Sequence, residues 1–379
     1  MFGIICQFLT SNNKTLIDRL FIATILFGAL LFICHFVICY LVSVVSNIAF
    51  SWVSPFVSFS NVRFFSQYQA YTLPILAIPL ITFNLPFRWR TVTLLLLAFW
   101  WALHFVTGTR SVWVALIVTT LFLFTFLKDQ ARQWLIWQLV GMLIGGIFYL
   151  AFDYLTLDNS LYGLGSITKR GLDDNGRWPL WLSAFEMIKN HPLLGVGPMH
   201  FAFNNFTIAA HPHNSVLHIA AEYGLPAVLI AIYLVITFLK KAVAWCIKPT
   251  YNENPQINIA LTASLVCGLC DSLLSGNIIM PHSQMMLFMI GGWLIGRNQA
   301  TDLISIELQP LQSKGRTLVL VVVVLAAITI QLNGVQSYYS YMKRTQFSAP
   351  EYAHPRFWND GHWPTKKNHS IAKSSNNDR

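Results

Sequence analysis

Charged residues are scarce in this chain of 379 residues, and acidic residues are the scarcer kind. Only 11% of the residues are charged, with 25 Lys and Arg against 15 Asp and Glu, whereas 55% are hydrophobic. A soluble protein of this length would bury one or two cores without repeated apolar runs of about 20 residues. The composition therefore excludes an ordinary soluble domain, and no nucleic-acid partner is expected.

Cysteine is also sparse: the six cysteines lie in or beside the predicted spans, and none falls in a predicted outer loop. No disulfide framework is expected. Cys267 and Cys270 have the spacing of a metal or redox motif, but they lie in an apolar run without companion ligands, which favours a structural role. No cleavable signal peptide is expected, because the first apolar run is too long and has no small-residue cleavage site, and we interpret it as an anchor. No internal repeat is visible.

What the chain does contain is a series of long apolar runs. Backbone polar groups within lipid must be satisfied internally, so these runs are predicted to be helices. We expect nine spans, at about 20–46, 69–85, 91–107, 110–127, 133–152, 218–239, 256–275, 282–297 and 317–335. The predicted fold is an all-α, polytopic transmembrane bundle. Its parts are N-terminal membrane helices (1–152), a large loop (153–217), C-terminal membrane helices (218–335) and a polar tail (336–379).

Positive charges indicate the orientation of the bundle. Lys and Arg gather in the loops that follow alternate crossings, and such loops are cytoplasmic. These residues are Lys14, Arg19, Arg88, Arg90, Lys128, Arg132, Lys240, Lys241, Lys248, Arg297, Lys314 and Arg316. The large loop is then predicted to face outward. The tail also lands outside although it is basic, so a missed or additional span would move one terminus. In the fifth span, Gly141, Gly145 and Gly146 predict close helix packing.

The large loop is the one long polar interruption of the chain. After a Gly-, Ser- and Asn-containing part, a helix is predicted from Trp178 to Asn190, with capping residues just before it and a stop at His191-Pro192. Its aromatic residues suit either the membrane interface or packing against the bundle. The Gly195-Val-Gly197-Pro198 turn that follows is a weak phosphate-loop signal, because no strand precedes it.

Arginines on the predicted outer face are candidate anion-binding groups. Arg110 is the only charge in a short turn between two spans, which favours a functional role. Its planar fork also suits phosphate oxygens. Arg63, beside Phe64, is interpreted either as a functional group or as an interfacial arginine. Arg170 and Arg177 flank two aspartates, so a salt-bridge network and a substrate clamp are both open.

The histidines near residue 213 are the second group of candidate functional residues. His211 and His213 flank a proline just before the predicted sixth span, with His218 and Glu222 close behind. A metal site needs three or four convergent ligands, whereas a general base needs one histidine near an acceptor hydroxyl, and we favour the base.

Two further polar residues lie on the predicted outer face, Asp271 at the end of the seventh span and His282 in the following turn. Either residue is expected to pair with an arginine of the large loop or to be a simple interfacial polar group.

Several strings together resemble the O-antigen ligase/polymerase superfamily of bacterial inner-membrane glycosyltransferases. They are NVRFFSQYQ, GTRSVWVAL, GRWPLWLSAFEMIKNHPLLGVGPMHF, HPHNSVLHIAAEYGLPA and SGNIIMPHSQ, and they occur in the family's order. The ligases' histidine pair is His213-Asn214, followed after nine residues by Gly224. The second glycine is Ala227 here, the Thr-Trp after it is Val228-Leu229, and the Arg-x3-Leu string ends in Val114.

The resemblance implies a glycan donor carried on undecaprenyl diphosphate, a lipid A-core acceptor, an inner-membrane location and an active site that faces the periplasm. It implies diphosphate binding by Arg63, Arg110, Arg170 and Arg177, with His213 as the base and Arg110 as a second catalytic group. Asn214, His211, Asp271 and His282 would support them. Neither a metal nor a cofactor is expected, and direct displacement would invert the anomeric centre.

Other functions remain open at this point. An O-antigen polymerase or a protein O-oligosaccharyltransferase would use the same donor with another acceptor. A transporter of lipid-linked glycans would instead predict charges deep within spans and inverted repeats, and the sequence shows neither.

Overall fold

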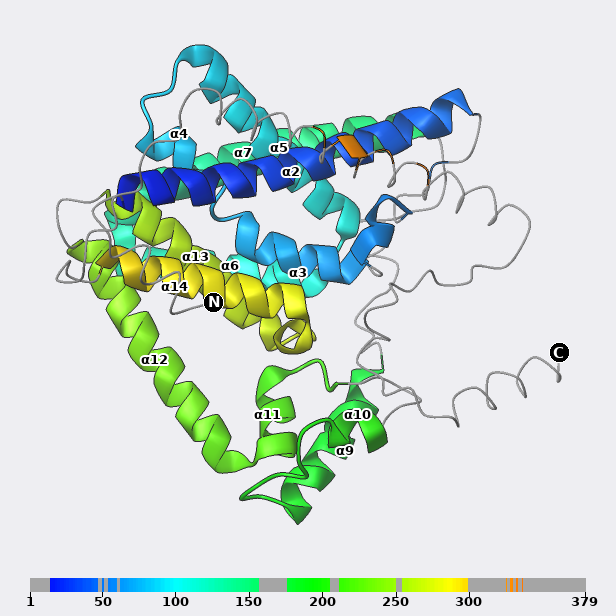
Figure 1. Ribbon diagram of the computed structural model, residues 1–379, viewed down its shortest axis with the longest axis vertical. Helices are drawn as coiled ribbons and strands as arrows, with labels where there is room; N and C mark the ends of the chain where they lie inside the picture. Colours follow the sequence, from blue (N-terminus) through cyan, green and yellow to red (C-terminus); the bar gives the residue numbers. More distant parts are fainter. Residues whose placement is uncertain are drawn as a thin grey trace. The chain divides into compact units, whose positions relative to one another are not determined.

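The computed structural model describes residues 14–46, 50, 54–59, 62–156, 176–204, 211–249 and 254–298, together with positions 325, 328, 329, 332 and 336. The chain divides into two compact units (Figure 1). We call the first the bundle unit, which comprises Met1–Gly171, Phe238–Asp271 and Pro281–Glu351. The second, the loop unit, comprises Leu172–Thr237, Ser272–Met280 and Tyr352–Arg379.

The bundle unit is helical throughout its described part. Its long helices are α2 (Lys14–Val45), α5 (Phe87–Thr107), α6 (Arg110–Leu127), α7 (Arg132–Thr156), α13 (Pro255–Ser272) and α14 (Pro281–Asn298). Shorter pieces are η1 (Ser54–Phe59), α3 (Val62–Thr72), α4 (Ile78–Thr82) and η2 (Lys128–Ala131). No strand occurs among the residues that the structure describes, which confirms the all-α class for that part.

Among the residues that the structure describes, four stretches are long and apolar enough to cross a membrane: Thr15–Val45, Phe87–Thr107, Arg110–Phe152 and Leu225–Ile247. The third holds two helices, α6 and α7, joined by η2. The predicted spans at 256–275 and 282–297 form helices α13 and α14, which fall outside these four stretches. The span at 317–335 lies almost wholly outside the described residues. Membrane-spanning helices are therefore supported, and the count of nine remains a prediction.

Helices α5 and α7 lie side by side (Figure 1), as the glycines of α7 predict. A Cβ atom on Gly145 would lie 2.4 Å from the carbonyl oxygen of Ala98, so only glycine permits this approach. Across the same contact, Trp101 donates its indole N–H to Gln138 at 3.1 Å. The small-residue face thus brings two backbones together, as it does in membrane helix pairs.

The predicted second span, 69–85, is not one helix, because the chain breaks between α3 and α4. Pro74 and Pro79 lack a backbone N–H and cannot continue a regular helix, so carbonyls within the break need donors from elsewhere. Side chains of α7 supply donors there: Gln138 to Leu73 O at 3.0 Å and Trp134 to Pro74 O at 2.8 Å. A broken helix is tolerated in a bundle when neighbours satisfy its backbone in this way.

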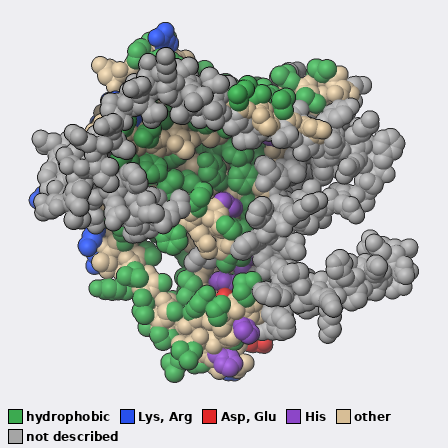
Figure 2. Space-filling view, viewed as in Figure 1, with side chains coloured by type: hydrophobic (Ala, Val, Ile, Leu, Met, Phe, Trp, Pro, Cys, Tyr) green, Lys and Arg blue, Asp and Glu red, His purple; other side chains and the backbone are tan. Residues whose placement is uncertain are grey.

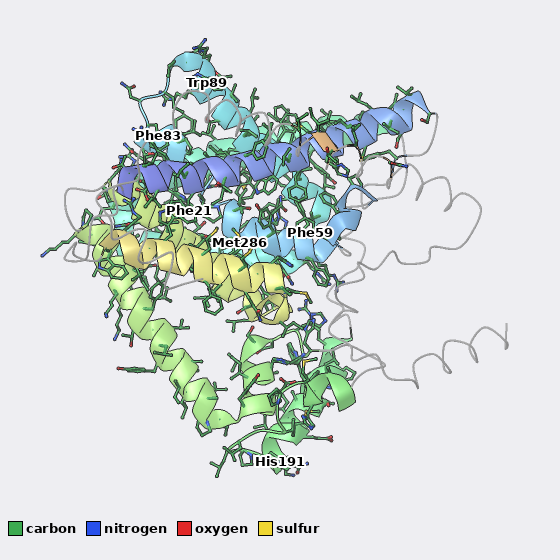
Figure 3. All side chains as sticks on the ribbon, in the orientation of Figure 1. Phe21, Phe59, Phe83, Trp89, His191 and Met286 are labelled. Carbon is green, nitrogen blue, oxygen red and sulfur yellow. The ribbon has the colours of Figure 1, made fainter. Side chains whose placement is uncertain are left out.

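A buried polar network joins the first and last described helices of the bundle unit. Arg297, which the charge pattern assigns to a cytoplasmic loop, is 1% exposed and pairs with Asp18 of α2. The loop assignment of Arg297 is therefore wrong. Trp293 also donates to Asp18, and Arg297 donates to Asn258 of α13 at 3.1 Å. Phe21, labelled in Figure 3, stacks on Trp293 beside this network.

The loop unit contains α9 (Arg177–Asn190), α10 (His200–Asn204), α11 (Ser215–Tyr223), the start of α12 (Leu225–Ile247) and the turn η4 (Asn277–Ile279). The helix predicted at Trp178–Asn190 is confirmed, and it ends at His191, labelled in Figure 3. Its predicted capping residues lie outside the described positions. The expected span at 218–239 is wrong at its start, because Gly224 (φ 85°, ψ 170°) separates α11 from α12.

Candidate active site

The HPHN segment forms a tight turn before α11. Asn214 caps the helix, since its side-chain oxygen accepts the backbone N–H of Leu217 at 3.0 Å. His213 has a φ of +54°, a left-handed backbone that is uncommon for residues other than glycine. Its N–H donates to Nδ1 of His211 at 3.2 Å, and the two rings lie 4.1 Å apart. The Nδ1 lone pair of His211 is therefore engaged by the backbone of His213.

Contacts from other segments of the loop unit hold this turn. Trp181 of α9 donates its indole N–H to the carbonyl of Pro212 at 2.9 Å. Ser215 donates its hydroxyl to the carbonyl of Ser272 at 2.6 Å. The ring of buried His211 lies against Gly276, where an added Cβ would be 2.2 Å from Cε1. Two segments far apart in the sequence, α9 and residues 272–276, thus hold the turn that carries His213.

A backbone clasp ties the HPLLGVG segment to the end of α11. Val196 and Gly197 donate their N–H groups to the carbonyls of Ala221 and Glu222, at 2.8 and 3.0 Å. A Cβ atom on Gly195 would lie 2.3 Å from the backbone of Glu222, so the glycine permits the contact. These N–H groups satisfy helix carbonyls, and the phosphate-loop interpretation of this turn is therefore wrong.

Glu222, His218 and Phe201 fill the interior behind the clasp. Buried Glu222 accepts the N–H of Phe201 at 3.2 Å and lies 3.5 Å from Nε2 of His218. Burial lowers the pKa of His218 from 6.5, and the neighbouring Glu222 carboxylate opposes that shift. No group of three or more His, Cys, Asp or Glu side chains has a metal-binding arrangement within the described ranges. Figure 2 shows histidine side chains among apolar ones over α9 to α11.

In the bundle unit, two predicted arginines lie at helix starts that contact each other. Arg110 begins α6, and Arg63 is the second residue of α3. The hydroxyls of Ser66 and Thr109 are hydrogen bonded at 2.8 Å, and this bond joins α3 to the turn that precedes Arg110. Arg63 is exposed and Arg110 is half-buried.

His282 belongs to the same end of the bundle unit. Its Nε2 hydrogen bonds to the carbonyl of Phe64 at 3.1 Å, next to Arg63. Asp271 is fully buried near the end of α13. The structure thus gathers Arg63, Arg110 and His282, although these residues are far apart in the sequence.

The remaining predicted residues divide between the loop unit and the part that is not described. Arg177, half-buried, begins α9 after Gly176. It shares the loop unit with His211, His213 and Asn214. Arg170 lies outside the described residues.

Sequence reasoning missed Trp181, Gly276 and Ser272, which hold the histidine turn. Trp181 stands within GRWPLWL, a string that carries the resemblance, but its spacing alone gives no sign of its partner. Ser272 acts through its backbone carbonyl and Gly276 through the lack of a side chain, so neither has a chemical signature in the sequence.

Comparison with known proteins completes the assignment. Residues 92–232 match a family model described as O-Antigen ligase, and this range includes Arg110, Arg177, the histidine turn and the clasp. No curated protein matches the chain. The resemblance to the O-antigen ligase/polymerase superfamily that the motifs carry is therefore confirmed for residues 92–232.

Proposed function

We propose that this protein is an O-antigen ligase of the bacterial inner membrane. It transfers a glycan from undecaprenyl diphosphate, on the periplasmic side, to a sugar hydroxyl of lipid A-core. The observation that carries the proposal is the supported histidine turn, in which His213 has a left-handed backbone and lies against His211. A strained residue held by several contacts is common at active sites, where position matters more than local stability.

His213 is the general base in this proposal. It takes the proton of the acceptor hydroxyl while that oxygen forms a bond to the anomeric carbon of the donor. The bond from the anomeric carbon to the phosphate oxygen breaks, undecaprenyl diphosphate leaves with the electron pair, and the configuration inverts. His211 is less suited to this step, because its Nδ1 accepts the N–H of His213 and its side chain is buried.

Arginines neutralise the charge that grows on the departing diphosphate. Fixed positive groups aimed at developing charge lower a barrier most effectively. We assign this role to Arg110 and Arg63 at their neighbouring helix starts, and to Arg177 and Arg170 of the large loop. Arg110 has the additional role of stabilising the transition state. Guanidinium groups supply the charge without a metal in this mechanism, and no cofactor takes part.

The test is a transfer assay in proteoliposomes with lipid-diphosphate glycan and lipid A-core, run with chelator. His213→Ala should lower the rate by about 10²–10⁴, the contribution typical of a general base. His191→Ala, which removes an exposed histidine at the end of α9, is the matched control and should keep wild-type activity. Arg110→Ala should also lower the rate, and Arg110→Lys should recover only part of it, because lysine cannot form the bidentate contact.

The assay also separates this function from its relatives. Elongation of the donor without transfer to lipid A-core would make the protein a polymerase. Labelling of an exported protein would make it an O-oligosaccharyltransferase. Full activity in His213→Ala would overturn the proposed base whichever acceptor is used.

A further inference from the structure

Leu193 and Leu194 are the most exposed large apolar side chains of the loop unit within its described residues. Their exposed fractions are 70% and 85%. They follow α9 directly and stand before the clasp glycine Gly195. Adjacent leucines with such large exposed fractions are unusual in a segment whose backbone is fixed. An exposed apolar patch of this kind commonly marks a binding site.

The clasp places these leucines at the start of a membrane helix. Leu225, the first residue of α12, donates its N–H to the carbonyl of Pro192 at 2.8 Å. A Cβ atom on Gly224 would lie 2.2 Å from the carbonyl oxygen of Leu193, so the two backbones touch. The leucines are therefore beside the first turn of α12.

The first turn of α12 is also where the candidate membrane span begins. The stretch Leu225–Ile247 meets the length and composition of a membrane span. Near its start Leu229 and Ile230 are exposed by 68% and 61%, as expected for residues that face lipid. When α12 spans a bilayer, side chains fixed beside this turn lie where the water and acyl regions meet.

The outer face of α9 adds a second apolar surface. Trp178, Leu182 and Phe185 recur at helical spacing and are exposed by 57%, 47% and 51%. Lys189 follows on the same face, whereas Glu186 lies to one side of it. Tryptophan, leucine and phenylalanine on one face with a lysine nearby are typical of helices that lie in a membrane interface.

We propose that the Leu193-Leu194 loop inserts into the outer surface of the bilayer and, together with the α9 face, docks the loop unit on lipid. The partner is the lipid surface itself, argued from continuity with the membrane helix α12. This inference does not depend on the transferase reaction. In the docked state the histidine turn is held close to the membrane surface through Trp181 of α9.

The test uses a small fluorescent amino acid at position 194 in nanodiscs that contain lipids spin-labelled just below the headgroup. A probe at 186, an exposed polar position of α9, is the matched control. Quenching by these lipids should be stronger at 194 than at 186 by about twofold or more, and iodide in the water should quench 186 more strongly. Equal lipid quenching at both positions would overturn the proposal. So would a probe at 194 that is shielded from iodide and not quenched by lipid, because a protein would then cover the loop.

A second measurement guards against an effect of the probe. Leu193→Ser combined with Leu194→Ser keeps the clasp, which uses backbone atoms alone. Backbone amides of α9 should exchange hydrogen faster in this variant than in wild type in nanodiscs, and equally fast in detergent. Unchanged exchange in nanodiscs would contradict the docking role. Neither readout requires activity, so failure here is distinct from failure of the proposed function.

Discussion

His213 combines two properties that the sequence shows separately and a third that it does not show. Its residue type and its place before a helix predict a base. Its partner Asn214 is a recognisable helix cap. The left-handed backbone and the support from His211 become visible only in the structure. A strained φ of this kind costs on the order of 1–3 kcal/mol, which the contacts of Pro212, Ser215 and His211 must offset.

Replacing Trp181 by phenylalanine tests that support. The ring is kept and the N–H donated to Pro212 is lost, so the turn loosens without a cavity. We expect kcat for glycan transfer to fall roughly tenfold, equivalent to about 1.4 kcal/mol in the transition state, with KM nearly unchanged. Trp178→Phe, an exposed tryptophan of the same helix, is the control and should have little effect. Equal losses in both variants would show that the bond to Pro212 is not what matters.

His218 makes the stability of the loop unit depend on pH. Burial lowers its folded pKa below 6.5, so between the folded and unfolded values the unfolded chain binds more protons. Stability is thus complete above about pH 6.5 and is lost as the pH falls toward the folded pKa. Between pH 7.5 and 5.5 the melting temperature of the wild type should fall by about 2 °C more than that of His218→Gln. A larger drop in the variant would contradict this sign.

At the scale of elements, the sequence predicts single helices better than their interruptions. The helices α6 and α9 begin and end within one residue of their predicted bounds, whereas α5 ends as predicted but begins at Phe87, about four residues early. The prolines of the second predicted span indicate an irregular helix, but they do not predict the position of the break after α3, and nothing predicts the separation of α11 from α12. Both interruptions lie within apolar runs, and hydropathy does not indicate where the helix breaks inside such a run. Carbonyls satisfied by Trp134 and Gln138 permit the first, and the backbone of Gly224 produces the second.

The clasp gives a physical reason for two glycine strings that otherwise seem unrelated. Gly195 and Gly224 each face the backbone of the other's segment, so neither tolerates a side chain. The strings HPLLGVG and YGL therefore form one structural unit, in which the end of α9 meets the start of α12. The sequence supports recognition of the strings, but their contact requires the fold.

Gly224→Ala should destabilise the protein strongly. Its φ of 85° and ψ of 170° lie in a region open almost only to glycine, and the new Cβ would meet Leu193 at 2.2 Å. We expect a loss of at least about 3 kcal/mol, combining strain and overlap. Gly176→Ala is the matched control, since its φ is also positive, at +73°, but a Cβ there meets nothing within 4 Å. It should cost about 1 kcal/mol. Thermal unfolding in detergent would measure both, and equal losses would exclude the contact with Leu193 as the cause.

At the scale of the whole molecule, the charge pattern predicts the sidedness of the chain. Lys128, the first residue of η2, and Arg132, which follows η2, predict that this turn is cytoplasmic, and the large loop is then predicted to lie on the opposite, outer side. Arg297 shows the weakness of such counting, because a buried ion pair uses a basic residue that hydropathy assigns to a loop. The long pairing of Asp18 with Arg297 could not be read from local sequence.

Cysteine labelling tests this orientation. In spheroplasts, a membrane-impermeant thiol reagent should modify Glu186→Cys at once and Asp129→Cys only after permeabilisation; both positions are exposed. The wild-type chain, which keeps its native cysteines, gives the background. The opposite result would invert the topology and place the proposed site on the cytoplasmic side.

The ion pair between Asp18 and Arg297 also bears on how the protein is made. The two residues are 279 positions apart, so at roughly 5–20 residues per second the ribosome needs some tens of seconds to supply the partner. During that interval the first helix carries a carboxylate with no guanidinium to meet it, near the edge of a bilayer that disfavours charge. Until then Asp18 is expected to stay in water or to take up a proton, and α14 then supplies its lasting partner. Completion of the bundle thus depends on a contact that joins its first and last described helices.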